Sequence, residues 1–141
     1  MNNFAIRISL IGASLLLVAC ATSPISTSQA KPVPADRLIL STFSQPGPST
    51  GEVIVKRDSG IGGSACSSKV FLDAKPVADL LTGEKVTLYL PEGEYLLGAF
   101  PNGICGGGLS ETRASVKPNQ TLLFRIGYGS NGDFYIQPTA F

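Results

Sequence analysis

Residues 85–90 read Lys-Val-Thr-Leu-Tyr-Leu, a regular alternation of apolar and polar side chains. This alternation is typical of a half-buried β-strand, because successive side chains of a strand point to opposite faces of its sheet. Val86, Leu88 and Leu90 therefore share one face. A Pro-Glu-Gly turn signal comes next and leads into a second β-rich run at residues 95–100, which predicts a hairpin.

The same period of two continues along the chain. In residues 121–128 one face carries Leu122, Phe124, Ile126 and Tyr128. Further β-rich runs, separated by turn-forming residues, lie at 37–43, 52–57, 69–73, 77–80, 109–116 and 134–137. Many short, regularly spaced strands without a sustained helical period predict an all-β fold, an antiparallel β-sandwich (Ig-like or related) of about seven to nine strands. The residues predicted to fill its core are Val86, Leu88, Leu90, Leu122, Phe124 and Ile126.

The first 19 residues have the layout of a secretory signal. A short polar start containing Arg7 precedes the uncharged run 8–19, which is shorter than the about 20 apolar residues of a membrane-spanning helix. Residues 17–20, Leu-Val-Ala-Cys, resemble the lipobox of bacterial lipoproteins. The resemblance implies cleavage before Cys20 and a diacylglycerol on its thiol. The alternatives are an ordinary secretory signal that ends near a cysteine and an uncleaved membrane helix, which the short run disfavours.

The residues after Cys20 bear on location and domain layout. Ala21 stands where an Asp often signals inner-membrane retention in Gram-negative lipoproteins, so the resemblance implies a lipid-anchored envelope protein, at the outer membrane if the organism is Gram-negative. Residues 21–35 are rich in Ser, Thr and Pro, which predicts a flexible tether. The expected layout is a signal peptide at 1–19, the lipid anchor and tether at 20–35, and a β-sandwich domain at 36–141.

The composition excludes several classes of function. Without the signal segment, ten Lys and Arg residues balance ten Asp and Glu residues, and the charges are scattered singly. Nucleic-acid binding normally needs a basic patch, so no nucleic-acid partner is expected. The chain contains no histidine, which removes Ser-His-Asp hydrolysis and HExxH zinc sites. We therefore expect no enzyme, no catalytic residues and no cofactor.

With Cys20 assigned to lipid, Cys66 and Cys105 remain. An even pair of cysteines in an exported protein predicts an intramolecular disulfide. Two thiols alone cannot complete a four-ligand zinc site, so no metal is expected.

Each of these cysteines lies in a glycine-rich segment, residues 59–66 and 102–108. A phosphate-binding loop would need a helix directly after it, whereas a β-rich run stands there instead. The glycines either let two backbones approach closely around the disulfide, or form a binding rim at one end of the sandwich. The candidate binding residues are Gly60, Ile61, Gly62, Gly63, Ile104, Gly106, Gly107 and Gly108.

Residues 53–99 also resemble a family of uncharacterised small bacterial lipoproteins, and their last part resembles short PEGA-type surface β modules. The resemblance is carried by Arg57 at the end of a strand, the hairpin 73–75 (Asp-Ala-Lys) and the segment 90–95 (Leu-Pro-Glu-Gly-Glu-Tyr). It implies a β-sandwich and no particular activity. Ala74 stands where glycine is usual, which leaves the turn type open.

Two functions from different classes are compatible with these observations. The first is an envelope-anchored structural or protein-interaction role, with the membrane, an envelope protein or a cell-wall component as partner. The alternative is a binding module for a small ligand such as a lipid or glycan, between the sheets or at the glycine loops. A filled core with an exposed sheet edge favours the first, and an apolar pocket favours the second.

Overall fold

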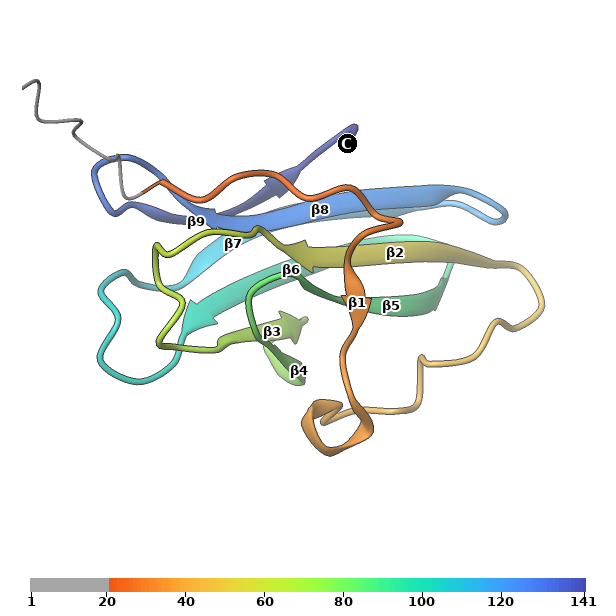
Figure 1. Ribbon diagram of the computed structural model, residues 1–141. Coiled ribbons are helices and arrows are strands. Elements are labelled where there is room, and N and C mark those ends of the chain that lie inside the picture. The colour runs from red at the N-terminus through yellow and green to blue at the C-terminus, as the bar shows by residue number, and fades with distance from the viewer. Residues whose placement is uncertain (1–20) are drawn as a thin grey trace, which may run out of the picture.

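The computed structural model describes residues 21–141, which form two β-sheets packed face to face (Figure 1). The five-stranded sheet has the order β1-β5-β2-β8-β9, and the four-stranded sheet has the order β4-β3-β6-β7. The strands are β1 (Lys31–Pro32), β2 (Thr50–Arg57), β3 (Ser68–Leu72), β4 (Lys75–Leu80), β5 (Glu84–Pro91), β6 (Gly93–Pro101), β7 (Ser110–Val116), β8 (Thr121–Tyr128) and β9 (Phe134–Pro138). The predicted β-sandwich is confirmed.

Most strand pairs are antiparallel, but β2 pairs in parallel with β8, and the short β1 pairs in parallel with β5. The sandwich is therefore mixed rather than purely antiparallel. In the centre of the larger sheet Val53 lies between Leu88 of β5 and Leu122 of β8, so three alternating strands present their apolar faces together.

The core lies between the sheets and is filled by aliphatic side chains from both of them. Five of the six predicted core residues are fully buried, and Leu122 is half-buried against the same cluster. The buried cluster consists of Val53, Val55, Val70, Leu72, Val77, Ala78, Leu80, Val86, Leu88, Leu90, Leu97, Ala99, Ala114, Val116, Phe124, Ile126 and Ile136. The strand faces agree with the alternation in the sequence.

Residues 37–43, predicted as a strand, do not form one. A 3-10 turn, η1 (Ala35–Arg37), opens a segment that crosses one side of the sandwich, where Leu38, Leu40 and Phe43 pack against the core. Single backbone bonds hold it, such as Ile39 N–H to Val77 O at 2.9 Å. Leu38, Leu40 and Phe43 cover the gap between the sheets, whereas Ile39 is 47% exposed.

The turn between β3 and β4 has an unusual backbone conformation. The φ angle is 46° at Asp73 and 63° at Ala74, so both residues adopt the left-handed conformation. Two successive left-handed residues are typical of the tight turns that join antiparallel strands. Ala74 therefore takes the conformation for which glycine is the usual residue.

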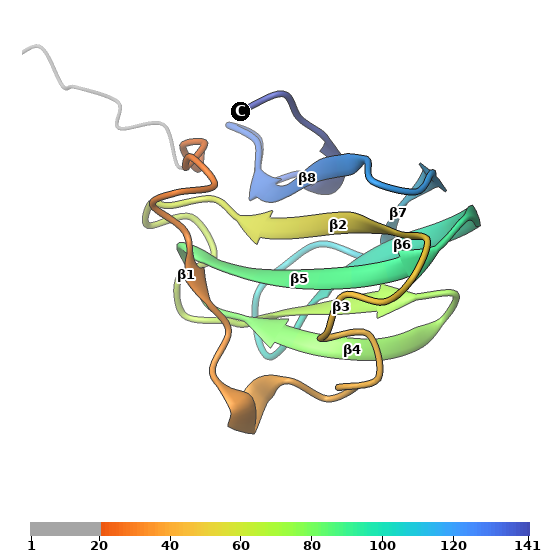
Figure 2. The ribbon, with the colours of Figure 1, turned by 90° about the vertical axis from the view of Figure 1, so that its right-hand side faces the viewer.

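The segment predicted as a flexible tether, residues 21–35, lies on the folded domain. Thr22 N–H donates to Tyr128 O at 3.0 Å, Ser23 forms a β-bridge with Ser59, and β1 extends the edge of the larger sheet. Figure 2 shows this segment beside β2, β5 and β8. Its polar composition does not prevent docking, because backbone hydrogen bonds to strands need no hydrophobic period. Residues 21–35 are therefore part of the folded unit, which was expected to begin at residue 36.

The predicted signal peptide at 1–19 and the lipidation site Cys20 lie outside the described residues. Among residues 21–141, no helix is long and apolar enough to cross a membrane.

The strand directions define two ends of the sandwich. At the disulfide end β2 finishes at Arg57, β8 finishes at Tyr128, and the loops 59–66 and 102–108 lie beside each other. At the opposite end, which we call the far end, β2 begins at Thr50 and β8 begins at Thr121.

Candidate functional site

A disulfide joins the two glycine-rich loops, as the cysteine count predicts. The Cys66 and Cys105 sulfurs are bonded at 2.03 Å, and their Cα atoms are 6.1 Å apart. The Cys105 N–H also donates to Cys66 Sγ at 3.2 Å. The bridge therefore holds the loops 59–66 and 102–108 at the same end of the sandwich.

A buried arginine supports the first of these loops from inside the sandwich. Arg57 comes after Val53 and Val55 on the core face of β2 and is 2% exposed. Its guanidinium donates to the backbone oxygens of Cys66, of Leu80 at 3.0 Å and of Gly63 at 2.6 Å. Burial lowers the pKa of Arg57, yet a guanidinium stays charged at neutral pH. Backbone carbonyl groups of the loop and of β4 therefore bind the Arg57 cation, which has no carboxylate within salt-bridge distance among the described residues.

Tyr128 packs against the same loop. A Cβ atom added to Gly63 would lie 2.2 Å from Tyr128 Cε2, and Gly63 has a φ of +65°. The Tyr128 ring also packs edge-on against Phe134, with 5.2 Å between the ring centroids. The packing under the loop therefore requires glycine at position 63, which favours a structural role for this residue over a role in binding.

The outer surface of the two loops is uncharged and presents two exposed isoleucines. Ile61 is 85% exposed and Ile104 is 97% exposed. Gly60, Gly106, Gly107 and Gly108 are also exposed, whereas Gly62 is half-buried. Residues 59–68 and 101–110 contain no charged side chain. Of the predicted binding residues, these exposed ones are available to a partner.

On the outer face of the larger sheet, a buried ion pair docks the N-terminal segment. Asp58 is 0% exposed, and its Oδ2 accepts hydrogen bonds from Arg125 Nη2 at 2.6 Å and Thr22 Oγ1 at 3.3 Å. Arg125 also donates to Tyr135 Oη. Burial raises the pKa of Asp58, and the positive charge of Arg125 opposes that rise. Gly127 leaves room for this cluster, because a Cβ there would lie 2.5 Å from Asp58 Oδ2.

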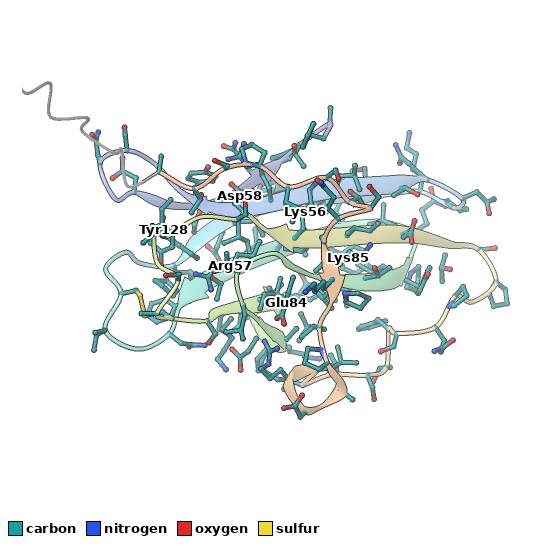
Figure 3. All side chains as sticks on the ribbon, in the orientation of Figure 1. Lys56, Arg57, Asp58, Glu84, Lys85 and Tyr128 are labelled. Carbon is teal, nitrogen blue, oxygen red and sulfur yellow. A yellow bond between two sulfur atoms is a disulfide. The ribbon has the colours of Figure 1, made fainter. Side chains whose placement is uncertain are left out.

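Lys56 lies on the same outer face and is buried under the N-terminal segment and the C-terminal residues. Its Nζ donates to Thr27 Oγ1 at 3.4 Å and to the backbone oxygen of Phe141. Burial lowers the pKa of Lys56. Figure 3 labels Lys56 and Arg57 at the end of β2, and Asp58, the next residue. Alternation places Arg57 inside the sandwich and its two neighbours on the outer face, where residues 21–30 cover them.

At the far end, an open groove of about 610 Å³ runs between β7 and β8. Ala114, Leu122, Phe124 and Pro138 contribute apolar surface to it, and Arg113 and Lys117 add positive charge. Among the residues of 21–141 that line the groove, none is acidic. No sequence pattern located this groove, because it forms where β9 stops pairing with β8 and leaves the start of β8 uncovered.

The groove is bordered by a free sheet edge. Within the described part of the chain, β7 pairs only with β6 through a ladder. The N–H and C=O of Leu96 point away from β7, since they bond Asp73 on the other side. Arg113 faces Leu96 across the ladder, so its N–H and C=O also point away from β6, toward the free edge. Because the hydrogen-bonding direction alternates from residue to residue, the main-chain groups of Ser115 point to the same edge. Nearer the disulfide end the edge is closed, because Ile136 N–H donates to Ser110 Oγ at 3.0 Å.

Among residues 21–141, no group of three or more possible metal ligands is present. In comparisons with known proteins, neither a family model nor a curated protein matches the chain. The candidate functional surfaces of the domain are the linked loops at the disulfide end and the groove at the far end.

Proposed function

We propose that this protein is a lipid-anchored protein of the cell envelope whose sandwich domain binds an extended segment of a partner protein along the free edge of β7. The anchor is the Cys20 thiol that the lipobox-like sequence predicts. The partner would be another envelope protein. The observation that carries the proposal is a free sheet edge beside a partly apolar, basic groove, in a sandwich whose interior is already filled.

The free edge favours an extended peptide as the occupant. Unpaired main-chain groups at Arg113 and Ser115 match those of an added strand, and the apolar groove can receive alternate side chains of that strand. The filled core also disfavours a ligand held between the sheets.

The charge of the groove specifies the chemistry of the partner. Arg113 and Lys117 line the groove, and the described residues of its wall include no acidic neighbour. The bound segment is therefore expected to carry Asp or Glu, which gives both orientation and specificity. A small anionic lipid or glycan in the same groove is the alternative, because 610 Å³ is within the range of small-ligand sites.

Photo-crosslinking in the native envelope tests the proposal. A photoreactive residue at Ser115 should crosslink to an acidic, extended segment of one partner. The Arg113→Glu/Lys117→Glu pair should abolish that crosslink. A matched probe at the exposed Lys75, on β4 at the opposite edge of the smaller sheet, should not capture the same segment.

Crosslinks that survive charge reversal, or that form equally from Lys75, would contradict the edge-binding role. A lipid or glycan that co-purifies with the protein and is lost on charge reversal, without any protein crosslink, would replace it with the ligand-binding alternative.

The edge itself can be tested by proline substitution. Ser115→Pro removes a main-chain N–H that points away from β6, and it should weaken crosslinking from a probe at Lys117. Glu111→Pro removes an N–H of the same orientation nearer the disulfide end, outside the groove, and is the matched control. Both variants should unfold at nearly the same denaturant concentration. Equal loss of crosslinking in both would show that the groove is not the binding site.

A further inference from the structure

We infer that the two disulfide-linked loops, residues 59–66 and 102–108, rest on the lipid surface, with Ile61 and Ile104 inserted among the lipids. The inference deepens the proposed function and rests on it, since it requires the lipid anchor at Cys20. It assigns the two disulfide-linked loops to a membrane partner, which the sequence alone does not specify.

The first argument is the short length of chain between the anchor and the domain. Thr22 is fixed to the domain by its N–H bond to Tyr128 O at 3.0 Å and by its hydroxyl bond to Asp58. Cys20 is two residues before Thr22, and two residues of extended chain span at most about 7 Å. Acyl chains on Cys20 therefore start close to the disulfide end, and no tether separates them from it.

The second argument is the position of the first loop beside that point. Thr22 Cα lies 3.4 Å from the position that a Cβ atom on Gly60 would take, and Ser23 N–H donates to Ser59 O at 2.8 Å. Ile61 is the next residue of this loop. Figure 1 shows the start of the described chain and the two loops at the same end of the molecule.

The third argument is the chemistry of the loop surface. Ile61 and Ile104 are 85% and 97% exposed, on loops that the disulfide joins. Residues 59–68 and 101–110 carry no charge, so inserting them requires no charged group to leave water. A lipid surface accepts such apolar side chains, and the absence of basic residues from these two stretches means that neutral lipids suffice.

This orientation is compatible with the proposed interaction site. The groove between β7 and β8 lies at the far end, where β8 begins at Thr121. With the disulfide end on the membrane, the groove and the free edge at Ser115 point away from the lipid and stay accessible.

The chain contains no tryptophan, so single tryptophans can report on membrane depth. Ile61→Trp and Ile104→Trp replace strongly exposed side chains and should leave the fold unchanged. Glu92→Trp, at the exposed turn of the far end, is the matched control. Each lipidated, full mature protein is reconstituted in phosphatidylcholine vesicles, with and without lipids brominated near the headgroup end of the acyl chain.

Tryptophan at 61 and at 104 should shift its emission to the blue and lose at least half of its fluorescence to the brominated lipid. Tryptophan at 92 should be unaffected, and added salt should not change the result. Flotation with the vesicles and the acyl mass on Cys20 are measured in the same samples.

If the protein floats but tryptophans 61 and 104 are as unquenched as tryptophan 92, the membrane-contact inference fails and the anchor stands. If Cys20 carries no acyl group, both the anchor and the inference fail. Quenching that requires anionic lipid would also contradict the inference, because the loop surface is uncharged.

Discussion

Asp58 and Arg125 pair on the outer face of the larger sheet, with 2.6 Å between Asp58 Oδ2 and Arg125 Nη2, although 67 residues separate them in the chain. The Asp58 side chain is 0% exposed and the Arg125 side chain is 16% exposed. The parallel pairing of β2 with β8 brings them together, and Thr22 covers the cluster. This ion pair therefore links the N-terminal segment to the central strands.

We predict that Arg125→Met destabilises the protein by about 3–5 kcal/mol, because it leaves a buried carboxylate without its partner. Burial already raises the pKa of Asp58 in the folded state. Its ionisation therefore lowers stability as pH rises from the unfolded pKa through the folded pKa. Without Arg125 the pKa of Asp58 in the folded state rises further, so the loss of stability should continue to higher pH.

Urea unfolding of Arg125→Met at several values between about pH 4 and pH 8 measures the effect. The double variant Asp58→Asn/Arg125→Met should lose the extra pH dependence and recover part of the stability. If Arg125→Met is as stable as the wild type at every pH tested, the pair contributes nothing to stability.

The disulfide should stabilise the domain by restricting the unfolded chain. Cys66 and Cys105 are 39 residues apart, for which loop entropy predicts about 4 kcal/mol. Cys66→Ser/Cys105→Ser should lower the free energy of unfolding by about that amount, and reducing the wild type should give the same result. Thiol labelling of the unfolded, unreduced protein should find neither cysteine free. Labelling of both would refute the bridge.

Gly63→Ala and Gly106→Ala form a matched pair in the linked loops. A Cβ on Gly63 would overlap the Tyr128 ring in a left-handed backbone conformation, whereas a Cβ on Gly106 would meet no atom within 4 Å. Gly63→Ala should cost about 2 kcal/mol or more, and Gly106→Ala less than about 0.5 kcal/mol. Chemical denaturation measures both. Similar values for the two variants would mean that the loop is not packed on Tyr128 in solution.

Cys20→Ser tests the anchor. The variant should leave the membrane fraction or keep its N-terminal segment, since the predicted acylation and processing both require the thiol. Mass spectrometry of the wild type should find a mature chain that begins at acylated Cys20. An unmodified N-terminus at another residue would contradict the lipoprotein prediction.

The sandwich and its core could be predicted because they depend on local alternation. Val86, Leu88 and Leu90 are buried as expected, since each strand must turn its apolar side to the other sheet. Residues 37–43 have strand-like composition for a different reason: Leu38, Leu40 and Phe43 cover an open side of the sandwich. Composition alone cannot distinguish a strand from a covering segment.

The charged sites could be predicted only in part. The alternation of Val53, Val55 and Arg57 indicates that Arg57 faces the core, but its hydrogen-bond partners come from loops whose course the sequence pattern does not specify. The partner of Asp58 depends on a parallel pairing between distant strands, which side-chain alternation cannot reveal. The groove could not be predicted because it depends on where β9 stops pairing with β8.

The parallel pairing of β2 with β8 also governs how early the domain can form. β2 lies at the middle of the larger sheet, but Thr121, which pairs with Glu52, is made 69 residues later. Until β8 joins it, the strand that will become the centre of the sheet has one bare edge. A nascent chain stopped before Tyr128 therefore exposes an unpaired strand and cannot pack the Gly63 loop on the Tyr128 ring, which makes it a natural target for chaperones and proteases.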